Sequence, residues 1–313
     1  MVETGSSSSR SPWHEGERAV QRRAGVPDAI EDIGRIVFQS SMTEQHRRFF
    51  AQLPFLVVGS IDGEGRPWAS LLAGRPGFAH SPDPEHLTVR ALPAPGDPLA
   101  GALRVGAALG TLGIELPTRR RNRMNGTVSA VDAEGFTVRV EESFGNCPQY
   151  IQRRDYGAER SGGAVEAEML TGLDAAARAA IRRADTSFVA SAARRVDVSH
   201  RGGQAGFLGI AEDGAIVVPD FSGNRYFNTL GNLAVNPRAG LLIPDFASGD
   251  LLQLTGTTET VWDGPELRAI AGAERLWRLT VTGGNRLRGA LPMAFRFGEY
   301  SPRSLATGVW QAA

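Results

Sequence analysis

The chain has 313 residues, which is enough for two domains of about 150 residues each. Its 34 basic and 34 acidic residues cancel, so no overall field favours nucleic acid or an anionic membrane as a partner. Lysine is absent, which excludes Schiff-base chemistry, covalently bound pyridoxal phosphate and a P-loop. We therefore expect anions to be bound through arginine, a permanently charged planar donor.

Cys147 is the sole cysteine, so an internal disulfide and a cysteine-rich zinc site are excluded. The five histidines are scattered, and we expect no metal site. The chain lacks an apolar run of the length of a membrane span and an apolar signal core, which favours a soluble, cytoplasmic protein. We interpret Cys147, which precedes Pro148 and has no histidine close in sequence, as a buried thiol; a nucleophile is the alternative.

The N-terminal part, residues 1–52, is predicted to be a helical extension. Arginine and glutamate recur at helical spacing over residues 15–24 and 27–39, and Thr43 suits the N-cap of a helix that ends near Gln52. We interpret Trp13, His14 and Glu15 as an arm that packs through its tryptophan, and a cover over a pocket is the alternative.

From Phe55 onward, short runs of Val, Leu and Ile alternate with turn sequences, which is typical of strands. The pattern of residues 70–78 returns at 199–207, an offset of 129. Gly-Thr at 126–127 returns at 256–257, an offset of 130. A nearly constant offset indicates a tandem duplication.

The second copy predicts six short strands and one helix in about 75 residues, which describes a small closed or split barrel. The strands are expected at 188–191, 196–199, 206–210, 216–219, 239–243 and 251–255, and the helix at 228–235, where Pro237 prevents its continuation. Between the copies, residues 172–183 predict a helix with Asp174 as its N-cap.

We therefore predict an α+β, mainly β protein in which two tandem split barrels pack as an intrachain pseudo-dimer. The predicted parts are the N-terminal extension (1–52), the first barrel (53–157), a linker and helix (158–184) and the second barrel (185–313).

A strand predicted to end near Pro219 is followed by a turn with Ser222, Asn224 and Arg225, and a helix begins directly after it. Backbone N–H groups, an amide and a guanidinium would converge at the start of this helix, which is a phosphate site without a Walker motif. A polar helix cap with a solvated arginine is the alternative.

Four segments together resemble the pyridoxamine 5'-phosphate oxidase-like, FMN-binding split-barrel family: Gly-Asn-Arg at 223–225, Asn-Pro-Arg at 236–238, Gly-Leu-Leu at 240–242 and Leu-Gln-Leu-Thr-Gly at 252–256. The resemblance covers roughly residues 185–262 and, through the repeat, more weakly 55–150. It implies that FMN lies between the two barrels. The cofactor residues that it implies are Arg225, Asn224 and Asn228 or Thr229 at the phosphate, Ser199 and Arg201 at the ribityl chain or ring, Gln253 facing the flavin, and Asp220 beside them.

The sequence also departs from the family pattern. It has no lysine for the phosphate site, and Pro95-Gly-Asp-Pro98 stands in the first copy where the second has Gly-Asn-Arg. We therefore expect one phosphate site in the chain. The Arg-x-His pair with which the vitamin oxidase binds its substrate is missing near the C-terminus, so pyridoxamine phosphate is not the expected substrate.

An arginine cluster precedes the strand that corresponds to 252–256. Alternate residues of a strand share a face, so Arg119, Arg121 and Arg123 are predicted to point one way at about 7 Å spacing. They would repel one another unless an anion bridges them, and we predict that they line the flavin pocket. A solvated edge strand is the alternative.

The expected function is an FMN-dependent oxidoreductase that passes hydride or electrons between the flavin and a small organic substrate, NAD(P)H or O2. No Gly-x-Gly-x-x-Gly motif or iron–sulfur cysteine spacing occurs, so NAD(P)H or an external reductase is the expected electron donor. We expect no general acid from the protein. A non-catalytic flavin sensor or carrier is the alternative, and the number of flavins and a homodimer stay open.

Overall fold

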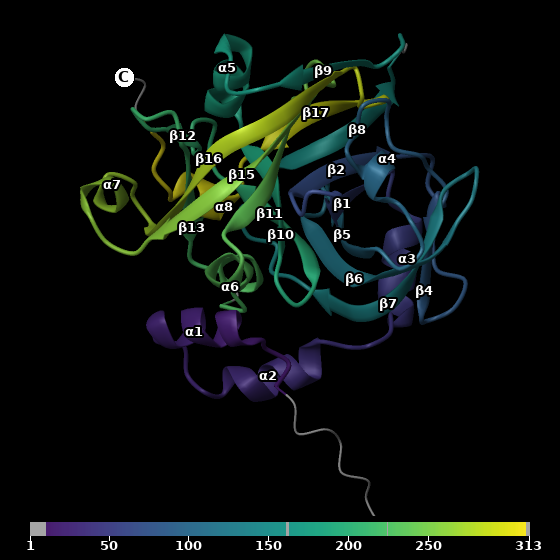
Figure 1. Cartoon of the computed structure of the whole chain (residues 1–313), viewed down its shortest axis with the longest axis horizontal. Helices are drawn as coiled ribbons and strands as arrows, with labels where there is room; N and C mark the ends of the chain where they lie inside the picture. Colours follow the sequence, from purple (N-terminus) through teal and green to yellow (C-terminus); the bar gives the residue numbers. More distant parts are fainter. Residues whose placement is uncertain (1–10, 161–162, 224, 311–313) are drawn as a thin grey trace, which may run out of the picture.

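The computed structural model describes residues 11–160, 163–223 and 225–310. Its first half forms a seven-stranded sheet (Figure 1). The strands of this sheet are β1 (Phe55–Ile61), β2 (Pro67–Ala73), β3 (Ala79–His80), β4 (His86–Val89), β5 (Ala108–Glu115), β6 (Arg120–Val131) and β7 (Phe136–Gly145). All of its neighbouring strands are antiparallel.

The second half forms an eight-stranded sheet. Its strands are β9 (Glu166–Leu170), β10 (Thr186–Ala192), β11 (Val196–Gly202), β12 (Gly209–Ile210), β13 (Ile216–Phe221), β14 (Arg238–Pro244), β15 (Leu251–Val261) and β16 (Ala273–Arg288).

The two sheets have the same strand order. The first runs β2-β1-β5-β6-β7-β4-β3 and the second β11-β10-β14-β15-β16-β13-β12, with β9 added beside β16. Even the irregularities correspond, because the register shifts between Asn125 and Gly126 in β6 and between Thr255 and Gly256 in β15. The predicted fold class, two tandem split barrels that pack as a pseudo-dimer, is confirmed by this topology.

The barrels pack closely along β1, β2 and β5 on one side and β10, β11 and β14 on the other. Phe55, Val57 and Leu112 share one buried apolar cluster with Phe188 and Leu242. Two glycines at corresponding places make this approach possible. A Cβ atom on Gly110 would lie 2.8 Å from the Cα atom of Asp197, and one on Gly240 would lie 2.5 Å from the carbonyl oxygen of Pro67.

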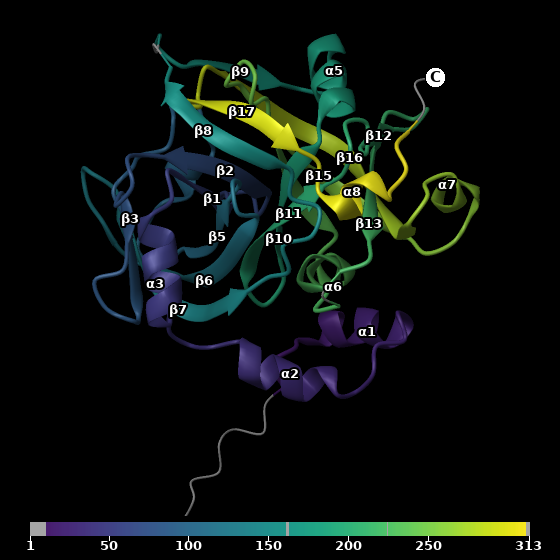
Figure 2. The ribbon, with the colours of Figure 1, turned by 180° about the vertical axis from the view of Figure 1, so that it is seen from behind.

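The helices lie around the sheets (Figure 2). They are α1 (Glu15–Arg23), α2 (Ile30–Val37), α3 (Glu44–Ala51), α4 (Leu99–Ala102), α5 (Ala175–Arg183), α6 (Asn228–Val235), α7 (Pro265–Arg268) and α8 (Pro302–Leu305). Thr43 and Asp174 cap α3 and α5 as predicted, since their side chains accept from backbone N–H groups of the first turn. Among the described residues no helix has the length and apolar character needed to cross a bilayer.

The N-terminal arm packs through its tryptophan, as expected. Trp13 is 2% exposed and its ring contacts Phe38 and Tyr226. Helix α1 lies against α6, where His14 Nε2 is 2.9 Å from Asn232 Oδ1. This contact anchors the extension on the second barrel.

The stretch 158–184 is more than a linker and a helix. Strand β8 (Arg153–Glu159) runs into it and pairs with β17 (Met293–Glu299), and β9 adds to the second sheet from within it. The polar side chains of β9 are largely exposed, so its sequence lacks the apolar alternation of a buried strand.

Candidate functional site

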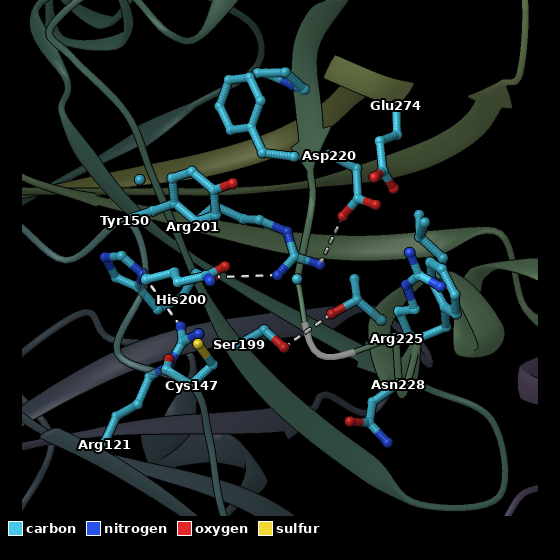
Figure 3. Close-up of a pocket in the computed structure, with 18 of the residues that line it drawn as sticks. Arg121, Cys147, Tyr150, Ser199, His200, Arg201, Asp220, Arg225, Asn228 and Glu274 are labelled. Carbon is cyan, nitrogen blue, oxygen red and sulfur yellow. Dashed lines mark hydrogen bonds and ion pairs between the residues drawn. The ribbon is translucent and has the colours of Figure 1, made fainter. Parts of the chain in front are cut away.

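A cavity opens between the two barrels, and we call it the interface pocket (Figure 3). The second barrel contributes β11, the end of β13 and the first turn of α6, and the first barrel contributes β6 and the loop after β7. Counting its open mouth, the pocket encloses about 800 Å³ of empty space.

Most residues predicted to bind a cofactor meet in this pocket. Its lining includes Ser199, Arg201, Asp220, Arg225, Asn228, Thr229, Arg121 and Arg123. Arg119 and Gln253 lie elsewhere, and Asn224 falls outside the described residues. Side chains from both halves of the chain therefore converge as the duplication predicts.

A buried network of hydrogen bonds and one ion pair holds several of the side chains that line the pocket. Arg123 Nη1 lies 3.0 Å from Asp197 Oδ2 in a buried ion pair and also donates to Asn228 Oδ1 at 3.2 Å. Ser199 Oγ donates to Asp197 Oδ2 at 3.3 Å, and Thr229 Oγ1 donates to Ser199 Oγ at 2.9 Å. These bonds fix the side chains that face the cavity.

The wall of the pocket carries an excess of positive charge. Of the described residues that line it, four are arginines and two are carboxylates. Arg121 Nε donates to the Cys147 carbonyl oxygen at 2.7 Å, and Arg201 lies 3.8 Å from Asp220. Burial, together with the charges of Arg123 and Arg201, lowers the pKa of Arg121 to about 9. A bound anion would relieve this repulsion.

His200 is a pocket residue that the sequence analysis missed. Burial and the nearby arginines hold its pKa well below the usual value, so the ring is neutral at pH 7. Arg121 Nη1 lies 3.4 Å from His200 Nδ1, and a guanidinium can only donate. Nδ1 therefore accepts and Nε2 carries the proton.

Among the described residues that line the pocket, three buried N–H donors have no hydrogen-bond partner: His200 Nε2, Arg123 Nε and Arg201 Nε. Buried donors are nearly always satisfied in folded proteins. The pocket is therefore suited to a ligand that is rich in acceptor atoms and carries negative charge.

The loop after β7 brings Cys147 and Tyr150 into the pocket, next to the second barrel. Tyr150 has a φ of 63°, and its hydroxyl donates to the Ser222 carbonyl oxygen at 2.9 Å. Its ring stacks near Phe221 at 5.4 Å between centroids. Cys147, which has no histidine close in sequence, here lines the same cavity as His200.

The prediction that Arg119 shares a strand face with Arg121 and Arg123 is wrong. Arg119 has a φ of 61° and belongs to the turn before β6, so strand alternation begins only at Arg120. Its Nε donates to the Ile151 carbonyl oxygen at 3.0 Å, away from the pocket. Only Arg121 and Arg123 of the three line the cavity.

Gln253 does not face the pocket either. Strand β15 is the counterpart of β6, so it contributes to the corresponding region on the other side of the inter-barrel contact. There Gln253 is buried, and its Nε2 donates to the Ala69 carbonyl oxygen at 3.0 Å and to Ser70 Oγ and Asp97 Oδ2 at 3.1 Å.

Comparison with protein-family models and with curated proteins finds no match. Among solved structures, HupZ from Group A Streptococcus is 12% identical over 35% of this chain and 89% of its own, with a TM-score of 0.29. A putative pyridoxamine 5'-phosphate oxidase from Lactobacillus delbrueckii is 17% identical over 34% of this chain and 98% of its own, with a TM-score of 0.28. A nimc/nima family protein from Clostridium acetobutylicum is 14% identical over 42% of this chain and 87% of its own, with a TM-score of 0.26. The fold class stands on the strand order of the two sheets and not on these similarities.

Proposed function

We propose that the interface pocket binds FMN and that the protein is an FMN-dependent oxidoreductase of the pyridoxamine 5'-phosphate oxidase-like kind. The observation that carries the proposal is the set of three unpartnered buried donors in a wall with excess positive charge. FMN supplies a matching group, because its phosphate is anionic and its ring carries several acceptor atoms.

The phosphate is proposed to lie at the start of α6. This helix has no side-chain cap among the described residues, so the N–H groups of its first turn lack that acceptor. Arg225 stands exposed at the mouth beside this turn, and Asn228 and Thr229 belong to the turn itself. These groups provide the donors and the charge that a phosphate needs.

The ribityl chain and ring are proposed to lie over β11 and β6. Ser199 and Arg201 face the cavity from β11, and Arg121 reaches it from β6. His200 offers its Nε2–H as a hydrogen-bond donor. Because its pKa is low, the ring is neutral at pH 7 and carries no extra proton that it could give up as a general acid. The pocket thus binds and orients its ligand and favours a ring that gains negative charge.

Bound FMN would supply the hydride or electron transfer. The reaction partners are proposed to be a small organic substrate together with NAD(P)H, O2 or an external reductase.

Titration of purified, flavin-free protein with FMN and with riboflavin tests the proposal. We expect saturable FMN binding that is at least about tenfold tighter than riboflavin binding, since one charge-assisted contact contributes that much. Equal affinity for the two would remove the phosphate site. Steady-state oxidation of NADPH and NADH by the FMN-loaded protein then separates an enzyme from a sensor or carrier, which would bind FMN and show no turnover.

A further inference from the structure

A second cavity opens beside the interface pocket, and we call it the outer basin. It lies between the end of α1, the residues before α6 and the start of β16, and encloses about 600 Å³ of empty space, counting its open mouth. Arg225, Phe227 and Glu274 line both cavities. The outer basin therefore adjoins the interface pocket.

Three arginines reach the outer basin from separate elements: Arg23 from α1, Arg225 from the residues before α6, and Arg275 from β16. Glu274 is the one carboxylate among its described lining residues. Arg275 already pairs with Glu274 and, at 3.5 Å, with Asp220. Arg23 and Arg225 thus represent positive charge in excess of the local carboxylates.

Aromatic rings hold two of these guanidinium groups. The Arg23 guanidinium carbon lies 4.2 Å from the centroid of the Trp262 ring, and that of Arg275 lies 4.8 Å from the Phe227 ring. A guanidinium that rests on a ring face keeps its N–H edges free for hydrogen bonds in its own plane. Arg275 is 4% exposed, and its Nε has no partner among the described residues. This arrangement suits the planar, two-pronged recognition of carboxylate or phosphate oxygens.

We propose that the outer basin binds the anionic group, a phosphate or a carboxylate, of the second substrate that reacts at the interface pocket. This inference rests on the proposed function for the identity of the reaction, and on the outer basin alone for the anion site. Arg225 lines both cavities and is shared with the proposed FMN phosphate, so Arg23 is the main ligand of this second anion. An anion held there leaves the remainder of the molecule beside Phe227, where the two cavities join.

The test is isothermal titration of the full chain, first loaded with excess FMN, with pyrophosphate and separately with citrate at low ionic strength. We expect saturable binding, and we expect Arg23→Gln to weaken binding of the better probe by about tenfold or more. Arg22→Gln is the matched control, because Arg22 lies in the same helical turn and outside the basin. It should leave the affinity within about twofold, and neither variant should change FMN affinity.

Tighter binding of pyrophosphate would identify the anionic group of the second substrate as a phosphate, and tighter binding of citrate would identify it as a carboxylate. Either result supports the proposal. Trp262→Leu keeps the charge of Arg23 and removes its aromatic support, so it should also weaken the better probe. Absence of saturable binding, or equal effects of Arg23→Gln and Arg22→Gln, would overturn the inference. If FMN does not bind, the proposed function fails separately, and the same pair of variants in flavin-free protein still decides the anion site.

Discussion

Side chains of the two barrels meet in two regions that correspond through the duplication. The two regions differ in their polarity and in whether they leave a cavity. Equivalent register places Arg123 opposite Leu112 in one half and Gln253 opposite Leu242 in the other. One region is the interface pocket, and we call the other, around Gln253, Ser70 and Asp97, the counterpart region. Corresponding positions of one fold thus carry a charged cavity in one place and a closed polar contact in the other.

The counterpart region pairs its side-chain donors, and among these three side chains only Gln253 Oε1 is buried without a hydrogen-bond partner. Ser70 Oγ donates to Asp97 Oδ1 at 2.5 Å, and Gln253 donates to the other carboxylate oxygen. Leu251, the counterpart of Arg121, belongs to a buried apolar cluster that also includes Leu287 and Leu291. The interface pocket leaves three buried donors unpartnered, whereas the counterpart region leaves one buried acceptor, Gln253 Oε1. The two regions of the duplication therefore differ in the polar atoms that they leave unpartnered, and this difference favours the interface pocket as the place of the proposed ligand.

The strongest destabilisation is expected at the buried ion pair of the pocket, compared with the hydrogen-bonded Gln253 contact of the counterpart region. Arg123→Met leaves Asp197 buried without its cation, so we expect a loss of about 3–5 kcal/mol of unfolding free energy. Gln253→Met removes hydrogen bonds from buried acceptors and should cost about 1–3 kcal/mol. Urea denaturation of both variants at pH 7 measures this. Equal losses would contradict the contrast.

The second prediction concerns the pH dependence of stability, which depends on a carboxyl group that hydrogen-bonds to the pocket network. Burial raises the pKa of Glu17 to about 7, and its Oε1 accepts from Asn228 Nδ2 at 2.6 Å. The unfolded chain loses this proton near its ordinary value of 4.5, so stability should be full below that pH and decline as pH rises toward 7. The full decline should amount to about 3.5 kcal/mol, since a pKa of about 7 exceeds the ordinary value of 4.5 by 2.5 and a difference of one corresponds to about 1.4 kcal/mol.

Glu17→Gln should flatten this decline and lie at or above the native protein in stability at pH 8. Denaturation midpoints measured from pH 4 to 8 check the expectation. An unchanged pH profile in the variant would show that Glu17 does not hold a raised pKa.

A third effect separates ligand binding from stability. Arg121→Gln relieves repulsion among the pocket arginines, so the stability of the flavin-free protein should stay level or rise, while FMN affinity should fall by about ten- to a hundredfold. Arg120→Gln is the matched control, because Arg120 pairs with Glu115 and lies over Phe49, outside the interface pocket. Thermal unfolding with and without FMN measures both quantities. An FMN-induced shift that Arg121→Gln leaves intact would refute a role for this arginine in binding.

The smallest expected effect is at the mouth of the pocket. Arg225→Ala should weaken FMN binding by roughly tenfold, because an exposed charge contributes less than a buried one, and should leave riboflavin binding within about twofold. Fluorescence titration with both ligands compares the two. A similar loss for riboflavin would place Arg225 away from the phosphate.

The sequence predicts most of the fold, because alternation, capping residues and turn residues indicate where strands and helices lie. It also predicts most of the pocket lining through the repeat and the turn before α6. The position of Arg119 is predicted wrongly because Arg119 itself adopts a left-handed turn conformation, so the strand begins one residue later. Gln253 is predicted wrongly to face the flavin because the packing of the two barrels, and not the local sequence pattern, decides which region a strand residue reaches.

His200 and Glu17 were missed for a related reason. Strand alternation sets His200 apart from Ser199 and Arg201, yet all three line the pocket. Glu17 meets Asn228 only because α1 packs against α6, a contact between residues far apart in the chain. Tertiary contacts of this kind have no short-range signal.

The ratio of bound flavin to protein tests the central claim most directly. Protein equilibrated with excess FMN and freed of unbound ligand is denatured, and the released flavin is measured against chain concentration. We expect a ratio that approaches one per chain, because the interface pocket is open and the counterpart region is closed. A reproducible ratio of two, or no retained flavin, would contradict it.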